Sequence, residues 1–324
     1  MSQTKPLVSY IVPTFNEAAI IAGNLGELYR HVSALEPKHP YEIIVVNDGS
    51  ADESGATAEA FARSHPNVTV VHHLRNQGLS AALQTGFHHA RGDLVVTLDV
   101  DLSYAPYHIN LMLRALEQTN AAMVLTSPYM RGGMVVNVPW TRKILSAWAN
   151  RYLSVATGGQ LATLTGMVRA YNAAALRKLN VSAAHMDFNY EVVFAALRLG
   201  LPVLEIPARL QWRSAPTGAS LRRSSMKVVS HSWSVMMAGL RFRPSMIFVL
   251  PALVPGIWPL LAASLAFFHS SRTIAIEATM ITLAVQLASM AFLGVLTGSY
   301  ITRLRRKPPA TLPLQTGSRT ESSA

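Results

Sequence analysis

Cysteine is absent from the sequence of 324 residues, and charged residues are few. Without cysteine the chain has no disulfide scaffold, no cysteine-ligated metal site and no thiol nucleophile. Only 14% of the residues are charged, against about 25% in an ordinary soluble domain. Basic nucleic-acid-binding proteins carry far more charge, so the composition excludes that class and nucleic acid is not an expected partner. A charge content this low indicates instead that part of the chain lies in lipid.

The net charge of +11 is concentrated in two short stretches. Residues 209–243 hold seven Lys or Arg and no acidic residue, and residues 303–307 hold four more. These eleven account for the whole excess, because the other 17 of the 28 basic residues are balanced by 17 acidic ones. The positive charge therefore marks particular segments rather than the whole protein.

Two uncharged runs of 25 residues, 244–268 and 278–302, follow the first basic stretch. Each run exceeds the ~20 apolar residues that a helix needs to cross a bilayer. Prolines in the first run would disrupt a soluble helix but are tolerated in a membrane helix. Two buried core helices are the alternative, which the length of the runs disfavours. The sequence predicts a transmembrane hairpin over 244–302, whose first arm could also be partly re-entrant.

The flanking charges predict how this hairpin is oriented. Two arginines precede it and the stretch 303–307 follows it, whereas the connecting loop carries a single arginine. Positive-inside bias then places both ends in the cytoplasm, and the apolar run near the N-terminus is too short for a signal peptide. The expected parts are a cytosolic domain (1–215), a basic juxtamembrane helix (216–243), the hairpin (244–302), and a basic stop with a disordered tail (303–324).

Within residues 1–215, short apolar runs alternate with segments of helical periodicity. Expected strands are 7–12, 41–46, 68–71, 94–98 and 122–125, and expected helices are 17–35, 52–64, 79–91 and 106–118. Asn16 is the expected N-cap of the first helix. The alternation predicts an α/β fold with a mostly parallel sheet covered on both faces. Ligands of such sheets bind at the carboxyl ends of the strands, where the polar motifs of this sequence fall.

The first two expected strands end in turns rich in hydrogen-bond acceptors. One turn contains Pro13, Phe15 and Glu17, and the other contains Asn47 and Asp48. Acceptors at neighbouring strand ends can read the donor edge of a base and a ribose. A plain turn with a helix cap is the alternative for the second motif. The pairing of the two motifs favours a nucleoside site.

A glycine turn, Arg75-Asn76-Gln77-Gly78, opens the third expected helix. A helix N-terminus that begins at glycine permits close approach of a phosphate. The motif is common loop chemistry when it stands alone, so Gly78 is a candidate phosphate contact only together with the motifs before it. The histidine pairs 72–73 and 88–89 are expected at a strand end and on a helix surface rather than as metal ligands.

Two carboxylates, Asp99 and Asp101, follow the fourth expected strand. In an extended segment residues two apart point the same way, so we expect the two side chains on one side. Such a pair repels itself unless a cation lies between, and hard oxygen ligands suit Mg²⁺ or Mn²⁺, whose other positions go to water and diphosphate oxygens. A solvated loop with two acids is the alternative. The buried strand before the pair and the nucleotide-type motifs favour the metal site.

Together these motifs resemble the successive signatures of family 2 glycosyltransferases, in particular of the branch of dolichol- and polyprenyl-phosphate mannosyl- and glucosyltransferases. The resemblance covers residues 7–215. It continues through Arg142-Lys143, Leu164-Thr165-Gly166, Arg169-Ala170-Tyr171, Phe188-x-x-Glu191, Glu205-Ile206-Pro207 and Arg213. Bacterial members of the branch similarly end in membrane helices, which favours a bacterial inner membrane over the endoplasmic reticulum for an integral membrane protein.

The resemblance implies a Rossmann-like GT-A fold that binds a GDP- or UDP-linked sugar together with Mg²⁺ or Mn²⁺. By similarity, the donor nucleotide is bound by Pro13, Phe15, Glu17, Asn47, Asp48, Gly78 and Asp99. The metal is held by Asp99, Asp101 and Ser103. The catalytic set is Asp101, Arg142 and Arg213, whose arginines face the donor diphosphate or the acceptor phosphate. Ser220 and Arg222 lie on the acceptor side.

Three departures from the family pattern concern mostly the acceptor side. Thr126-Ser127-Pro128-Tyr129 stands where the family has Ser-Gly-x-Arg-Tyr, so that arginine is missing unless Arg131 replaces it. Thr163 stands where an acid is usual, and Ser220-Leu221-Arg222 stands for Ser-Lys-Leu. The donor motifs are intact, whereas the acceptor motifs have drifted.

The expected reaction is inverting transfer of a sugar to polyprenyl phosphate at the cytoplasmic membrane face. An ionised phosphate acceptor needs cations rather than a strong general base, and the basic run before the hairpin suits this. A hydroxyl of a glycolipid or another lipid-linked acceptor is the alternative, with Asp187 and Glu191 as candidate bases. A non-catalytic membrane scaffold is a second alternative. A processive polysaccharide synthase is disfavoured because Gln-x-x-Arg-Trp is missing.

Two further expectations concern assembly and the membrane surface. Apolar residues alternate with basic ones over 222–240. The pattern indicates an amphipathic helix that lies in the membrane interface, packs against the catalytic domain, or does both. The protein is also compatible with a homo-oligomer.

Overall fold

The computed structural model of the chain describes residues 5–35, 39–179, 188–213 and 228–243. They belong to the first of two compact units, which spans Met1–Pro244. The predicted hairpin and tail, together with Asp187, Ser220 and Arg222, lie outside the described residues. Within the described part of the chain, no helix has both the length and the apolar character needed to cross a bilayer.

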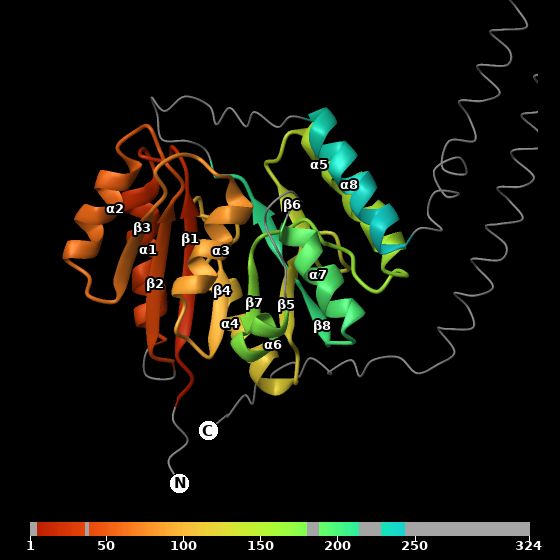
Figure 1. Cartoon of the computed structure of the whole chain (residues 1–324), viewed down its shortest axis with the longest axis horizontal. Coiled ribbons are helices and arrows are strands. Elements are labelled where there is room, and N and C mark those ends of the chain that lie inside the picture. The colour runs from red at the N-terminus through yellow and green to blue at the C-terminus, as the bar shows by residue number, and fades with distance from the viewer. Residues whose placement is uncertain (1–4, 36–38, 180–187, 214–227, 244–324) are drawn as a thin grey trace, which may run out of the picture. The chain divides into compact units, whose positions relative to one another are not determined.

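A seven-stranded sheet with the order β3-β2-β1-β4-β7-β5-β8 forms the centre of the fold (Figure 1). Its strands are β1 (Val8–Thr14), β2 (Tyr41–Asn47), β3 (Val68–His72), β4 (Leu94–Thr97), β5 (Met123–Ser127), β7 (Arg169–Asn172) and β8 (Val203–Pro207). Strand β7 is antiparallel to both of its neighbours, and the other pairs are parallel. The mostly parallel, Rossmann-like α/β sheet predicted from the sequence is therefore confirmed.

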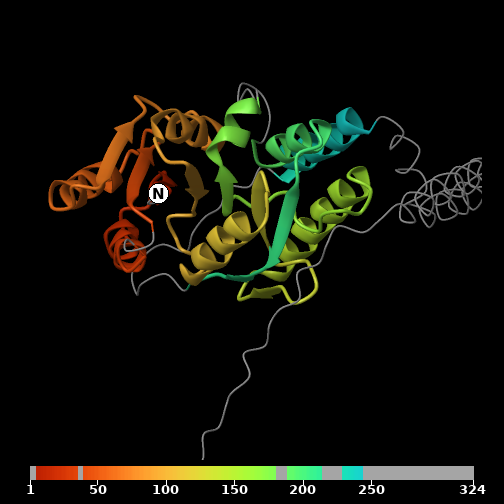
Figure 2. The ribbon, with the colours of Figure 1, turned by 90° about the horizontal axis from the view of Figure 1, so that it is seen from below.

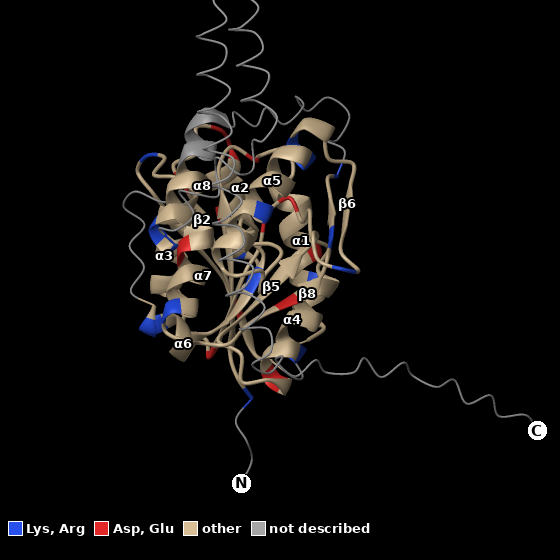
Figure 3. Cartoon of the chain, turned by 90° about the vertical axis from the view of Figure 1, so that its right-hand side faces the viewer, with Lys and Arg blue, Asp and Glu red and all other residues tan. Residues whose placement is uncertain are grey.

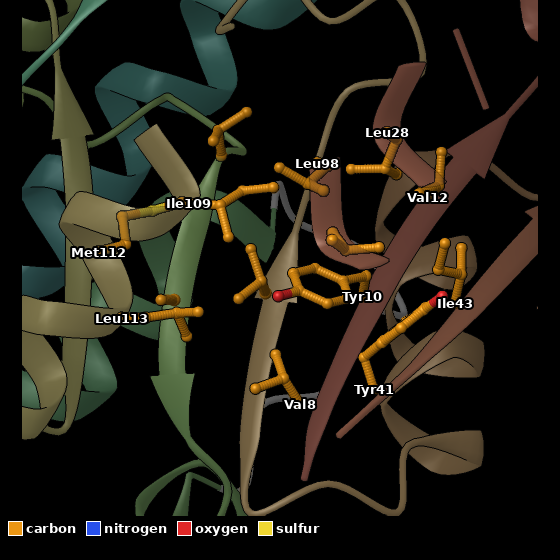
Figure 4. Close-up of a cluster of buried hydrophobic side chains, with 14 of the residues drawn as sticks. Val8, Tyr10, Val12, Leu28, Tyr41, Ile43, Leu98, Ile109, Met112 and Leu113 are labelled. Carbon is orange, nitrogen blue, oxygen red and sulfur yellow. The ribbon is translucent and has the colours of Figure 1, made fainter. Parts of the chain in front are cut away.

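Helices cover both faces of this sheet, as the view from below shows (Figure 2). Those named here are α1 (Ile21–Ser33), α2 (Ser54–Arg63), α3 (Leu79–His89), α4 (Tyr107–Gln118), α6 (Ala173–Lys178) and α7 (Phe188–Arg198). The main core, drawn in Figure 4, joins one face of the sheet to α1 and α4 around the fully buried Tyr10. Strands buried on both faces read as continuous apolar runs, which is why their positions were readable from the sequence.

On the other face, α3 packs so closely on the sheet that one position admits only glycine. A Cβ on Gly86 would lie 2.3 Å from Cγ2 of Ile11 on β1. This close approach fixes the height of α3 over the sheet. It thereby fixes the N-terminal end of α3, next to the carboxyl ends of β1 and β2.

A small second sheet and two helices extend the domain beyond the expected strands. A two-stranded parallel sheet joins β6 (Met134–Val136) to β9 (Arg209–Gln211). Helix α5 (Trp140–Ala156) lies side by side with α8 (Val228–Phe242) in Figures 1 and 2. Tyr152 Oη donates to the Met236 carbonyl oxygen across this pair at 3.0 Å. Because Val235 and Ala238 of α8 are fully buried, this helix packs against the rest of the first unit, which is one of the arrangements expected from its pattern.

The first helix differs from its prediction. It begins at Ile21 rather than at residue 17, and its N-cap position is Ile20, which makes no side-chain capping bond. Asn16 is therefore not the cap. Its backbone has a φ of 54°, a left-handed conformation that asparagine tolerates better than most residues, and the chain turns there before entering the helix.

Candidate functional site

The carboxyl ends of β1, β2 and β4 meet at one edge of the sheet. The register pairs Thr14 with Asn47 and Ile11 with Thr97, so the loops after these strands lie next to each other. Asn16 ties the first two loops together. Its backbone N–H donates to Ser50 Oγ at 3.0 Å, and its Oδ1 accepts from the Ala51 N–H at 2.9 Å. The two acceptor-rich turns therefore form one unit, as their pairing in the sequence suggested.

Asp52 holds the same unit from the second turn. Its carboxylate accepts from the Ala18 N–H at 3.1 Å and from the Ser54 N–H at 3.0 Å. Burial raises the pKa of Asp52, but the hydrogen bonds from Ser54 and from the Ala18 backbone lower it by more. The pKa of Asp52 therefore lies below its usual value. Asp52 thus supports the turn as an ionised structural group.

Asp48, a predicted nucleoside contact, organises the glycine turn before α3. Only 3% of it is exposed, and its two carboxylate oxygens lie on four donors. These are His73 Nδ1 at 2.7 Å, Asn76 Nδ2 at 2.8 Å, the Gln77 N–H at 2.9 Å and the Gly78 N–H at 2.8 Å. The bonds position the helix N-terminus that Gly78 opens. The sequence did not predict the part played by His73.

The other predicted nucleoside residues differ in how accessible they are. Phe15 is 43% exposed and can offer its ring to a base, whereas Pro13 is buried. Asn47 is also buried, and its side chain bonds His72 Nδ1 at 3.0 Å and the Ser50 N–H at 3.2 Å. The Glu17 N–H donates to Ser54 Oγ at 2.7 Å. Asn47 and Asp48 therefore shape this edge of the sheet. Among the predicted nucleoside residues in these two turns, Phe15 has the most exposed side chain.

Asp99 and Asp101 both line one pocket, but their backbone differs from the expected extended segment. They lie in a β-turn after β4 rather than in an extended segment, and the Leu102 N–H donates to the Asp99 carbonyl oxygen at 3.1 Å. Leu102 has a φ of 48°, and the Ser103 N–H donates to Asp101 Oδ1 at 3.0 Å. Both residues line one pocket, which agrees with a shared side, whereas the extended geometry from which that side was predicted is wrong.

The pocket that receives both carboxylates has a volume of about 320 Å³. Its lining includes Leu79, Asp99, Asp101, Ser103, Tyr104, Tyr129, Arg142, Ser146, Thr163, Thr165, Met167, Asn189 and Trp212. Arg142 reaches it from the first turn of α5, with its guanidinium carbon 4.9 Å from the centre of the Trp212 ring. One predicted catalytic arginine therefore lies in the same pocket as the paired carboxylates.

Arg213 lies in a neighbouring cavity of about 200 Å³. This cavity is lined by Leu102, Ser103, Ala105, Tyr107, Arg209, Gln211 and Arg213. Arg213 makes a two-pronged ion pair with Glu27 of α1, with N–O distances of 2.7 and 2.8 Å. Hydrogen bonding to Glu27 and the charges of Glu27 and Asp101 outweigh its partial burial and raise the pKa of Arg213. The two predicted arginines thus belong to adjacent cavities that share Ser103.

The loop over residues 162–167 forms one wall of the larger pocket, and three polar side chains support it, of which two are buried and Glu205 is partly buried. Asn150 Oδ1 accepts from the Leu164 and Thr165 N–H groups at 2.8 and 3.1 Å. Glu205 accepts from the Ala162 and Thr163 N–H groups, both at 2.7 Å. Burial raises the pKa of Glu205 above its usual value despite these two bonds.

The third support is Arg169, which is 1% exposed. Its guanidinium donates to the carbonyl oxygens of Leu164 and Asn189 and so connects the loop to α7. Asn150 belongs to no motif of the sequence analysis, whereas Glu205 and Arg169 belong to motifs quoted for the family resemblance. Their structural role was not predicted.

Two departures from the family pattern lie near this wall. Thr163 stands where an acid is usual, and its Oγ1 lies 2.7 Å from Ser127 Oγ in a buried hydroxyl pair. Arg131 is exposed and does not line either cavity, so it does not replace the missing arginine there. Glu191, a candidate base, also lines neither cavity. Burial raises the pKa of Glu191, while the charges of Arg198 and Arg241 oppose the shift.

The oxygen donors in the larger pocket fit a hard divalent cation. In the described part of the chain, no group of three or more His, Cys, Asp or Glu could enclose a metal ion. Mg²⁺ and Mn²⁺ sites that use one or two carboxylates leave the other positions for water and substrate phosphates. Burial, and to a lesser degree the charge of Asp99, raise the pKa of Tyr104, which lines the same pocket. Asp99, Asp101 and Ser103 would therefore hold such an ion in an open site.

Comparison with known proteins decides the family. The sequence profile described as glycosyl transferase family 2 matches residues 9–180. The chain belongs to glycosyl transferase family 2. This glycosyltransferase is 32% identical to the polyprenol monophosphomannose synthase of Mycolicibacterium smegmatis, and the match covers 69% of this chain and 86% of that protein. It is 30% identical, over 72% of its length, to 97% of the undecaprenyl-phosphate mannosyltransferase of Micrococcus luteus.

Solved structures support the GT-A fold of this glycosyltransferase. A mannosyltransferase from Pyrobaculum calidifontis, solved with GDP-Man and Mn²⁺, superposes with a TM-score of 0.57. It is 19% identical, and the match covers 94% of this chain and 89% of that one. Glucosyl-3-phosphoglycerate synthase from Mycobacterium tuberculosis with UDP gives a TM-score of 0.55 at 20% identity, over 73% and 80% of the two chains. The likeness at this level concerns the fold.

Proposed function

We propose that this glycosyltransferase moves a sugar from a GDP- or UDP-linked donor to polyprenyl phosphate, with inversion at the anomeric carbon. The observation that carries the proposal is the pocket at the carboxyl ends of the strands, where Asp99 and Asp101 face the same space as Arg142. Two relatives that match most of the chain are named as transferases to polyprenol or undecaprenyl phosphate. Mannose is the sugar that both of those names contain.

The chain's own residues divide the binding of the donor among three supports. Phe15 stacks on the base, and the turn that Asp48 organises brings the N-terminus of α3 toward the phosphates. Asp99, Asp101 and Ser103 would hold Mg²⁺ or Mn²⁺, which would supply positive charge to the diphosphate leaving group. Arg142 adds a positive charge in the same pocket.

The chemistry of the pocket favours a phosphate acceptor over a hydroxyl. In the transfer, the bond between the anomeric carbon and the donor phosphate breaks while an acceptor phosphate oxygen forms the new bond. A phosphate monoester, with a second pKa near ~6, is already ionised at neutral pH and has no proton to lose. Among its described lining residues, the pocket has no acidic side chain besides Asp99 and Asp101, and Thr163 takes the place of the usual acid. A hydroxyl acceptor would need a base within hydrogen-bond reach.

The proposed location is the cytoplasmic face of a membrane, with the hairpin over 244–302 as the anchor and both termini in the cytoplasm. Its support is the charge pattern: two uncharged runs of 25 residues flanked by basic stretches, with one arginine between them. A lipid-linked acceptor in the cytoplasmic leaflet of that membrane would be on the same side of the membrane as the pocket. A bacterial inner membrane is the proposed compartment.

The test uses membranes that contain the full-length chain. They are incubated with Mn²⁺, polyprenyl phosphate and a panel of labelled GDP- and UDP-sugars, and the label that enters the chloroform phase is measured. Mild acid should release this label, and the linkage should have the anomeric configuration opposite to that of the donor. Label that resists mild acid would show transfer to a hydroxyl and contradict the proposal. Equal labelling by the chain with Asp99→Asn and Asp101→Asn would favour a scaffold.

A further inference from the structure

One face of α5 carries large apolar side chains that no other described element covers. Trp140 is 73% exposed, Ile144 60%, Trp148 40% and Val155 38%. Exposed residues of this size are scattered singly on most soluble domains, whereas these four belong to a single helix. We define Trp140, Ile144, Trp148 and Val155 as the α5 stripe.

Helical geometry puts the α5 stripe on one side of the helix. At 100° per residue, the four positions fall within about 80° of one another. The opposite side serves the catalytic domain: Arg142 and Ser146 line the larger pocket, and Ala149 and Leu153 are buried. The apolar stripe is therefore not a misplaced core face, because α5 has a separate core face.

Basic side chains accompany the stripe. Arg151 is exposed and falls between Trp140 and Ile144 on the helical projection, and Lys143 is exposed at its margin. Helix α5 contains three basic residues and no acidic one. Tryptophan side chains with interspersed cations are typical of helices that lie in the headgroup region of an anionic bilayer. The ribbon in Figure 3 marks the positions of Lys and Arg in blue and those of Asp and Glu in red.

Helix α8 connects the surroundings of α5 with the start of the first uncharged run. Helix α8 packs along α5, and its last residue is Phe242. The first uncharged run of 25 residues begins two positions later, at Pro244. The described chain thus ends next to the helix that carries the stripe, at the point where the predicted membrane segment starts.

We propose that the α5 stripe lies in the interface of an anionic lipid bilayer. The occupant of the stripe is lipid, and Lys143 and Arg151 contact its headgroups. The same helix then has one side in the bilayer surface and Arg142 in the catalytic pocket, so a lipid-linked acceptor reaches the pocket without leaving the membrane. In this respect the inference rests on the proposed function, although the position of the stripe is tested without it.

The absence of cysteine allows a direct depth measurement. Single variants Ile144→Cys and Trp148→Cys of the full chain are spin-labelled and reconstituted into vesicles of phosphatidylcholine with phosphatidylglycerol. Leu111→Cys on α4 is the matched control, because Leu111 has the same 40% exposure as Trp148. Labels on α5 should collide with oxygen more than with a water-soluble nickel complex, at depths of about 5–10 Å. The label at Leu111 should show the aqueous pattern.

Three results would overturn the inference. Aqueous accessibility at both α5 positions means that the stripe faces water. Protection from both oxygen and nickel that persists in detergent means that residues 244–324 cover it. Spin–spin broadening that disappears on dilution with unlabelled chain means that a second copy covers it.

A kinetic arm connects the stripe to the reaction. The double variant Trp140→Ser with Ile144→Ser should raise KM for long-chain polyprenyl phosphate in vesicles by roughly tenfold, because it removes apolar burial in the bilayer surface. A tenfold change corresponds to about 1.4 kcal/mol. KM for a short, water-soluble prenyl phosphate and for the donor should not change, nor should they for Leu111→Ser. An equal rise in both acceptor KM values contradicts the inference. Failure of every chain to use polyprenyl phosphate would instead contradict the proposed function, whatever the label depths show.

Discussion

Replacing Arg169 by methionine tests the reasoning about the pocket wall most directly. The substitution keeps an apolar stem of similar length but removes the donors to the carbonyl oxygens of Leu164 and Asn189. Each buried acceptor left without a partner costs about 1–3 kcal/mol, so the loss should lie between about 2 and 6 kcal/mol. For a unit of this size, about 2–4 °C of melting temperature corresponds to 1 kcal/mol.

The melting temperature of Arg169→Met should therefore fall by at least about 4 °C in thermal unfolding followed by tryptophan fluorescence. The donor KM should also rise, because Asn189 and the neighbours of Leu164 line the pocket. Arg177→Met is the matched control: it is the same substitution at an exposed position, and its effect should stay within about 0.5 kcal/mol. If the two variants melt within about 1 °C of each other, the carbonyl bonds do not support the wall and the reasoning is refuted.

Three further predictions use other parts of the domain. Asp101→Asn should reduce Mn²⁺-dependent transfer by more than about 10²-fold without lowering the melting temperature, measured as label in chloroform; full activity would exclude the metal role. Glu27→Gln should lower stability at pH 7 by about 0.2–1 kcal/mol, because the ion pair is partly exposed. Since the hydrogen bond from Arg213 lowers the pKa of Glu27, this stability exists above the unfolded pKa and disappears as the pH falls through the folded one, so denaturation curves of the two proteins should converge in acid. Gly86→Ala should destabilise by about 1–3 kcal/mol in urea titrations through its contact with Ile11, whereas Gly23→Ala, in open space on α1, should stabilise by up to about 1 kcal/mol.

The positions of β1 to β5 and the placement of Asp99 and Asp101 at the edge of the sheet were predictable from the sequence. Ser103 and Arg142 were grouped with that pair only through the resemblance to family 2 glycosyltransferases. Apolar runs identify buried strands, and the topology of parallel sheets brings the residues after them to one edge. The local geometry of the Asp pair was not predictable in the same way. The chain leaves this turn through Leu102, whose backbone is left-handed with a φ of 48°, and a leucine in the sequence does not predict that conformation.

Contacts between distant parts of the chain escaped prediction for a different reason. Glu27 and Arg213 are 186 residues apart, and no local pattern on either helix or strand marks them as partners. The same holds for His73 and Asp48, whose bond depends on how far β3 extends beside β2. The amphipathic pattern over 222–240 did identify a helix, but it was compatible with two environments. The packing of α8 against α5 is a property of the folded domain alone.

The short bridge between Tyr104 and Leu210 has a consequence for how the domain can vary. It pairs the two positions in antiparallel fashion, and the Gln211 N–H donates to the Ser103 carbonyl oxygen at 2.8 Å. The segment between Tyr104 and Leu210, about a hundred residues, therefore begins and ends at neighbouring positions close to Asp99 and Asp101. Loop-closure entropy grows slowly with length, about 0.6 kcal/mol per doubling. Insertions or deletions within this segment can therefore be accommodated while the turn that carries Asp99 and Asp101 keeps its position.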